Sequence, residues 1–168
     1  KNKNVLTDLV CFLGAGMYDR YIPSSIGALI SRGEFLTAYT PYQPEFSQGY
    51  LQTIYEFQTM VAELFGMDLA NASMYDGATA MAEAAILSYG VNGKTEVAVS
   101  EAVHPHYRQV IETYAWSIGL TVKLVPASTG NSDWAGQISD STTCLIVQSP
   151  NFFGIIEDLA EARRIADS

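Results

Sequence analysis

Residues 71–85 read Asn71-Ala72-Ser73-Met74-Tyr75-Asp76-Gly77-Ala78-Thr79-Ala80-Met81-Ala82-Glu83-Ala84-Ala85, and the rest of the chain is organised around them. We predict a short strand over residues 69–71, a tight turn and then a helix. Asp76 is a suitable N-cap, because its carboxylate can accept hydrogen bonds from the free backbone N–H groups of the first turn. Gly77 lets another segment or a ligand approach the backbone closely.

The helix that follows Asp76 has one apolar stripe at helical spacing, formed by Ala78, Met81, Ala82, Ala85, Ile86 and Tyr89. Small side chains in such a stripe favour close packing against a sheet. A helix N-terminus that follows a strand is also where α/β proteins hold phosphate groups. The stretch therefore either cradles a phosphorylated cofactor or caps a helix of the core.

Strands and helices alternate in the second half of the chain. Strands are predicted over residues 96–100, 121–125 and 143–148, with a helix opening at His104-Pro105 and another starting at Glu157. This alternation predicts a mostly parallel sheet with right-handed crossovers and flanking helices. We therefore assign an α/β domain to residues 67–168.

Residues 1–66 are predicted to form an N-terminal arm and interface helices. Pro23 suits the first position of a helix that Gly33 closes. Residues 35–45 carry two prolines and several aromatic residues, which favours an ordered loop or extended arm over a central strand. A long helix over residues 48–65 is apolar on two faces, so we expect it to lie between its own domain and another subunit.

The composition excludes some classes of partner. The 168 residues carry a formal net charge of −9, which argues against binding to nucleic acid or an anionic membrane. Charged residues make up 16% of the chain, below a usual share of about 25%, so part of the surface is expected to meet a partner. Cys11 and Cys144 lack neighbours at metal-ligand spacing, which predicts free thiols in a reducing cytosol and no metal site.

Several motifs together resemble the P-protein of the glycine cleavage system, which is glycine dehydrogenase (decarboxylating). The motifs occur in order along residues 11–168, and the match resembles subunit 1, the N-terminal-half subunit of the two-chain bacterial enzyme. They are Phe12-Leu13-Gly14-Ala15-Gly16, Thr37-Ala38-Tyr39-Thr40-Pro41-Tyr42-Gln43-Pro44-Glu45, Ser47-Gln48-Gly49, residues 71–80, His104-Pro105 and Pro150-Asn151-Phe152-Phe153-Gly154.

The resemblance implies part of the large domain of a fold-type-I pyridoxal-phosphate (PLP) transferase. It implies a cytoplasmic, oligomeric oxidoreductase that decarboxylates glycine and passes the aminomethyl group to the lipoyl H-protein. It also implies that the catalytic partner, P-protein subunit 2, binds the coenzyme and that this chain holds none. The chain's own role would then be structural, or the completion of the partner's active site.

On this resemblance the chain carries no catalytic residue, and its cofactor-site positions are degenerate. These positions are Asp76, Gly77, Ala78, Thr79 and His104. A carboxylate at Asp76 would repel a phosphate and compete for the same N–H donors. His104 stands where the catalytic copy has its stacking histidine, or it only caps a helix. The lysines Lys1, Lys3, Lys94 and Lys123 all lie away from the late strand where the family carries its Schiff-base lysine.

Two groups of residues are predicted to contribute to an active site or to an interface, and each has two possible interpretations. The residues Tyr39, Tyr42, Gln43 and Glu45 either reach the partner's active site or stitch the subunit interface together. Asn151 follows an apolar strand at the sheet edge where α/β sites gather, but asparagine is also an ordinary turn residue.

We expect the chain to be a fragment of a longer protein, and we expect it to self-associate through bare sheet edges. Two other functions remain open at this stage. One is a truncated PLP-dependent lyase or aminotransferase of another specificity. The other is a stand-alone α/β binding or assembly domain.

Overall fold

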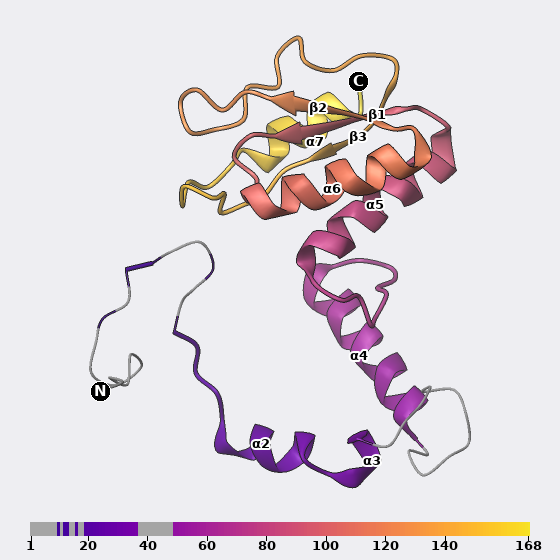
Figure 1. The fold of residues 1–168 in the computed structure, drawn as a ribbon, viewed down its shortest axis with the longest axis vertical. Helices are drawn as coiled ribbons and strands as arrows, with labels where there is room; N and C mark the ends of the chain where they lie inside the picture. Colours follow the sequence, from indigo (N-terminus) through magenta and orange to yellow (C-terminus); the bar gives the residue numbers. More distant parts are fainter. Residues whose placement is uncertain (1–9, 11, 14–15, 17–18, 37–48) are drawn as a thin grey trace. The chain divides into compact units, whose positions relative to one another are not determined.

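The computed structural model describes residues 10, 12–13, 16, 19–36 and 49–168. The described elements divide between two compact units, residues 1–73 and residues 74–168, and each unit is considered by itself. The predicted domain boundary between residues 66 and 67 stays a prediction. In chain order the elements are α2 (Ser24–Ile30), α3 (Gly33–Leu36), α4 (Tyr50–Phe65), α5 (Gly77–Asn92), β1 (Glu96–Ser100), α6 (Pro105–Ile118), β2 (Thr121–Val125), β3 (Thr142–Ile146) and α7 (Leu159–Ala166) (Figure 1).

The unit formed by residues 74–168 has the predicted α/β architecture. Its sheet has the order β2-β1-β3, and both pairs of neighbouring strands are parallel. The ends of β1 and β2 agree with the prediction, whereas β3 begins one residue earlier and ends at Ile146. Helices α5 and α6 cover one face of this sheet and α7 lies on the other (Figure 1). The carboxyl ends of the parallel strands therefore meet at one edge.

The central strand β1 supplies side chains to two apolar layers. Val97 and Val99 are fully buried against α5 and α6, in a cluster that includes Ile111. Ala98 points to the other face and packs in the cluster that contains Trp134 and Ala162 of α7. Successive residues of a strand point to opposite faces, so a strand covered on both sides is apolar throughout. The run Val97-Ala98-Val99 fits this central position.

Strand β3 has an irregularity that α5 secures. The register pairs Glu96 with Thr142 and Val97 with Cys144, so it passes over Thr143 in the manner of a β-bulge. The Thr143 carbonyl accepts hydrogen bonds from Ser88 Oγ at 2.8 Å and from Asn92 Nδ2 at 3.1 Å. The Thr143 hydroxyl also lies 2.8 Å from Asn92 Oδ1. The last turns of α5 thus fix the residue that the ladder leaves unpaired.

The unit formed by residues 1–73 corrects several sequence predictions. Pro23 is the N-cap of α2 and not its first helical residue, and Gly33 begins α3 and does not close α2. No strand forms over residues 69–71, where the described backbone makes no ladder. Helix α4 ends at Phe65 as predicted but begins at Tyr50, later than the predicted start at residue 48, and its C-cap Gly66 has a φ of 65° in the left-handed region. Glycine tolerates that conformation without steric cost, which explains the position of the helix end.

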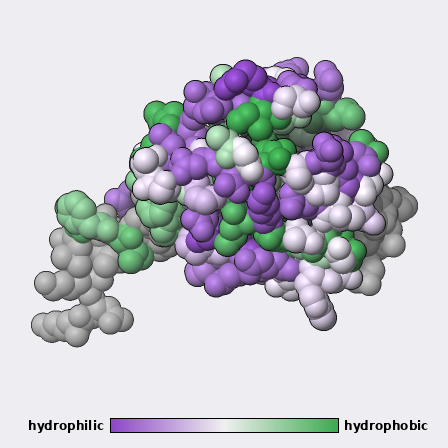
Figure 2. All heavy atoms as spheres, turned by 90° about the horizontal axis from the view of Figure 1, so that it is seen from above, coloured by the Kyte–Doolittle hydropathy of each residue, from purple (hydrophilic) through white to green (hydrophobic). Residues whose placement is uncertain are grey.

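Exposed apolar residues are numerous on the described surface. Figure 2 shows hydrophobic residues scattered among hydrophilic ones on one face of the molecule. The most exposed in residues 74–168 include Tyr75, Trp116 and Ile156. Within the part of the chain that the structure describes, none of the helices combines the length and apolar character that crossing a membrane requires.

Candidate functional site

The N-terminus of α5 is closed by its own side chains. Asp76 Oδ1 accepts a hydrogen bond from the backbone N–H of Thr79 at 2.8 Å. In return, Thr79 Oγ1 accepts from the backbone N–H of Asp76 at 3.1 Å, which completes a capping box. The Thr79 N–H bond lowers the pKa of Asp76 from its ordinary value. The predicted N-cap is confirmed, and the end of the helix already carries a negative charge.

The space beside Gly77 is occupied by Tyr107 of α6. A Cβ atom placed on Gly77 would lie 2.6 Å from the Tyr107 hydroxyl oxygen, which is closer than van der Waals contact allows. The close approach predicted at Gly77 is therefore made by the chain itself. The next residue, Ala78, is buried and Thr79 is half-buried. The first turn of α5 is accordingly filled from the side of α6.

His104 is the N-cap of α6 and belongs to an aromatic cluster. Its Nδ1 accepts a hydrogen bond from the His106 N–H at 3.2 Å, and its backbone N–H donates to Gln148 Oε1 at 3.0 Å. Its ring centroid lies 5.3 Å from that of Tyr107 and 5.1 Å from that of Phe152 in an edge-on arrangement. Tyr107 thus links His104 to Gly77, so the structure brings these two predicted positions together.

Asn151 lies in a buried polar network at the carboxyl edge of the sheet. Its Nδ2 donates to the Gly130 carbonyl at 2.7 Å and to Glu157 Oε1 at 2.8 Å. Its Oδ1 accepts from the backbone N–H groups of Phe153 and Ile155. Both amide donors and the acceptor are therefore engaged within this chain. The position agrees with the predicted edge, and its contribution to an active site stays a prediction.

Glu157 and Ser100 extend this network and were not singled out from the sequence. Glu157 Oε2 accepts from the Ser132 N–H at 3.0 Å, and Ser132 Oγ donates to Ser100 Oγ at 2.7 Å. Glu157 and Ser100 are buried. A usable signal was the position of Ser100 as the last residue of an apolar strand. Glu157 was predicted to start a helix and so resembled an ordinary first-turn acid, but α7 begins at Leu159 after the N-cap Asp158.

The described lysines lie away from the aromatic cluster. Lys94 is exposed and precedes β1, so it lies at the amino edge of the sheet. Lys123 is half-buried in the middle of β2, and its Nζ donates to the Gln137 carbonyl. Neither amine is at the edge that carries Gly77 and His104. Together with the carboxylate of Asp76, this arrangement does not fit a PLP group held by the residues that the structure describes.

Several residues predicted from the sequence lie outside the described part of the chain or carry no ligand site. Tyr39, Tyr42, Gln43 and Glu45 lie outside the described residues, as do Lys1, Lys3 and Cys11. Cys144 is a free thiol, and burial raises its pKa. Among the described residues, no three His, Cys, Asp or Glu side chains are grouped so that they could hold a metal ion.

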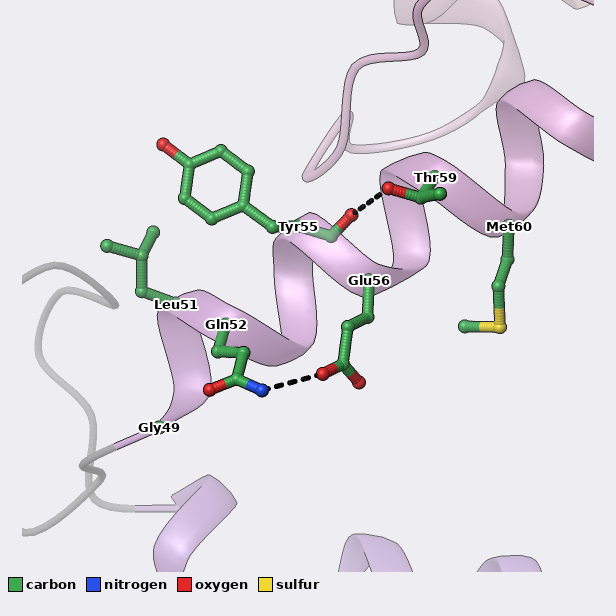
Figure 3. A pocket seen from close by; sticks show the side chains of 7 residues that line it. All are labelled: Gly49, Leu51, Gln52, Tyr55, Glu56, Thr59 and Met60. Atoms are coloured by element: carbon green, nitrogen blue, oxygen red, sulfur yellow. Dashed lines mark hydrogen bonds between the residues drawn. The ribbon is translucent and has the colours of Figure 1, made fainter.

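Helix α4 borders an open depression of about 710 Å³. Figure 3 shows Leu51, Tyr55 and Met60 projecting from the helix along it, with Gln52 hydrogen-bonded to Glu56. Thr59 Oγ1 donates to the Tyr55 carbonyl at 3.1 Å. The side chains of Gln52 and Glu56 are thus paired with each other, while Leu51 and Met60 add apolar surface to the lining. This depression has the character of a protein-contact surface.

Comparison with known proteins identifies the family. The family model described as glycine cleavage system P-protein matches residues 1–168. The chain is 54% identical, over 169 aligned residues, to the probable glycine dehydrogenase (decarboxylating) subunit 1 of Anoxybacillus flavithermus. The subunit of the same name from Bacillus pumilus is also 54% identical. Each alignment covers 99% of this chain and 38% of the relative, so the chain spans well under half the length of these relatives.

A solved structure agrees with this assignment. The chain matches a crystal structure of glycine decarboxylase (P-protein) of the glycine cleavage system in inhibitor-bound form, with a TM-score of 0.84 and 47% sequence identity. The match covers 94% of this chain and 36% of the other. It confirms the expected α/β fold, part of a PLP-dependent transferase domain. The chain belongs to the P-protein family of the glycine cleavage system.

Proposed function

We propose that this chain is part of the non-catalytic subunit of a glycine dehydrogenase (decarboxylating). In the assembled enzyme, the catalytic partner subunit binds PLP, glycine loses carbon dioxide, and the aminomethyl group passes to the lipoyl H-protein. The chain supports this chemistry by shaping and completing the assembly. The proposal rests on the family and on the names of the relatives, which are called subunit 1.

The observation that carries the proposal is the closed N-terminus of α5. A phosphate at a helix N-terminus uses the free N–H groups of the first turn and the positive end of the helix dipole. Here Asp76 takes the Thr79 N–H, and Tyr107 fills the space beside Gly77. A phosphate at this point would meet a carboxylate and lose a donor. We therefore assign the coenzyme to the partner chain.

The lysines support the same assignment. The coenzyme supplies an electron sink for the carbanion that decarboxylation leaves, and it needs an amine of the protein to anchor it. Lys123 already donates to Gln137, and Lys94 stands at the amino edge of the sheet. We infer that the described residues contribute packing and shape to the assembled enzyme and do not anchor the coenzyme.

The test is to locate the coenzyme by chain. The subunit that contains residues 1–168 is expressed alone and with the catalytic subunit, loaded with PLP and reduced with borohydride. Mass spectrometry of the separated chains is expected to find the reduced coenzyme on the catalytic subunit only. Glycine decarboxylation is expected only when both subunits are present.

Lys94→Ala and Lys123→Ala serve as matched controls and should leave coenzyme loading of the complex unchanged. A borohydride-stable adduct on either lysine of this chain would overturn the proposal. Decarboxylation by this subunit without its partner would do the same.

A further inference from the structure

Arg108 carries a buried hydrogen-bond donor without an acceptor. It is half-buried in the first turn of α6, and its Nε is buried. No hydrogen-bond partner for this Nε lies in the part of the chain that the structure describes. The guanidinium Nε–H can only donate a hydrogen bond, so another group must supply the acceptor. Among the described residues this donor is therefore buried without compensation.

The chain has ample acidic groups, yet none of the described ones serves Arg108. There are 18 Asp and Glu residues against 9 Lys and Arg residues. Arg32, Arg163 and Arg164 each pair with a nearby carboxylate, whereas Arg108 belongs to none of the ion pairs among the described residues. An acceptor from another chain would complete the fork of donors that a guanidinium presents.

The surroundings of this end of α6 suit a protein partner. Arg108 stands one turn after His104, the N-cap of α6, and its backbone N–H donates to the His104 carbonyl at 3.1 Å. That end carries the His104–Phe152 contact, and Phe152 packs edge-on against Phe153. Phe153 is 61% exposed. Aromatic residues and arginine are enriched at protein interfaces, whereas lysine and acids are depleted there.

We propose that Arg108 binds a carboxylate of the catalytic partner subunit, so that its guanidinium is paired only in the assembled enzyme. This inference rests on the proposed function, because it takes the catalytic subunit as the partner. It assigns Arg108 a positioning role that the free chain does not satisfy. The same residue then destabilises the free chain and stabilises the complex.

Because Arg108 is expected to lower the stability of the free subunit and to raise its affinity for the partner, one substitution tests both effects. Arg108→Met keeps most of the aliphatic stem and removes the donors. In the free subunit that contains residues 1–168, thermal or denaturant unfolding should show unchanged or increased stability, because the buried unpaired donor is gone. Binding to the catalytic subunit, measured by calorimetry or sedimentation, should weaken roughly 30-fold or more.

Two further variants separate the explanations. Arg108→Lys keeps the charge without the planar fork and should recover only part of the affinity. Arg163→Met removes the exposed partner of Asp167 on α7 and should leave the affinity unchanged. The affinity of the wild-type complex should fall with added salt more steeply than that of Arg108→Met.

Each remaining outcome has a defined meaning. If Arg108→Met lowers the stability of the free subunit, the acceptor lies in the same chain and the inference is wrong. If it leaves the affinity unchanged, a water molecule satisfies Nε and the inference is also wrong. If the wild-type subunit fails to bind the catalytic subunit, the proposed function itself is wrong.

Discussion

Helices α4 and α5 have the same length, and each ends at a glycine in the left-handed conformation, yet their surroundings differ. Helix α5 buries three alanines, has a capping box and bonds to β3 through Ser88 and Asn92. Within α4, all of which the structure describes, only Ala62 is buried and the N-cap makes no side-chain bond. Both helices are apolar, but among the described residues α5 buries more of its apolar side chains than α4 does, although Leu87 and Val91 of α5 stay exposed.

The difference shows that apolar periodicity does not reveal what covers a helix. Small residues in α5 allow close contact with a sheet, whereas α4 presents large residues such as Tyr55, Phe57 and Met60 that remain exposed. Large apolar side chains on an open surface are typical of a contact with another chain. The expectation that α4 lies between its own domain and another subunit stays a prediction, and the following experiments test the contrast.

The largest effect is expected from overfilling the α5 contact. Ala82 is fully buried, so Ala82→Leu should lower the free energy of unfolding by about 3 kcal/mol through strained packing against the sheet. Glu83→Leu introduces a leucine at the next, exposed position of the same helix and should change stability by less than about 0.5 kcal/mol. Denaturant titration measures both, and equal effects would show that the buried side of α5 is no more tightly packed than its exposed side.

A smaller effect is expected at the end of α5. Asn92→Ala removes the amide that bonds to the Thr143 carbonyl and lies within 2.8 Å of its hydroxyl, which should cost about 1 kcal/mol. The matched change in α4 is Gln52→Ala, because the side-chain bond that Gln52 makes among the described residues is to the exposed Glu56. That variant should fall within about 0.5 kcal/mol of the wild type. A larger loss from Gln52→Ala would contradict the contrast between the helices.

Lowering the pH should reduce the stability that the N-cap of α5 provides, and this effect should be smaller than that of the preceding substitutions. The Thr79 N–H holds the pKa of Asp76 below its ordinary value, so the unfolded chain takes up a proton at higher pH than the folded chain. The stabilisation is present above the unfolded-state pKa and is lost as pH falls through the folded-state pKa. Asp76→Asn keeps an acceptor at the N-cap but removes this titration. Unfolding curves measured across acidic pH should therefore differ in slope between the two proteins, and parallel curves would refute the assignment.

The smallest effect on the chain alone is expected in α4. Leu64 is 79% exposed, so Leu64→Ala should alter its stability by less than about 0.5 kcal/mol. If α4 meets another subunit, the same substitution should weaken assembly with the catalytic subunit. Sedimentation of the mixture measures this, with Glu63→Ala as an exposed control. Loss of stability in the free chain would place Leu64 in a core and not at an interface.

Local signals predicted much of the second unit. Asp76 and His104-Pro105 mark the starts of α5 and α6 through backbone chemistry that depends on a few neighbouring residues. The strand predicted over residues 69–71 was wrong, because Ala70 and Asn71 are of types depleted in strands and no described segment pairs with them.

The sequence pattern could not predict contacts between residues that are far apart along the chain. The approach of Tyr107 to Gly77 depends on how α6 crosses α5, and the bond from Asn151 to Gly130 depends on where two loops meet. The unpaired donor of Arg108 is likewise a property of packing. The sequence indicated where the candidate site lies, whereas the structure showed which side chains fill it.

The hydrogen bonds from Ser88 and Asn92 to Thr143 have a consequence for motion within the fold. Because Ser88 and Asn92 hold the bulged residue, β3 cannot detach at that point unless the last turn of α5 releases it. The two segments should therefore open together, and the slowly exchanging amide hydrogens of both should be replaced by deuterium in one cooperative step.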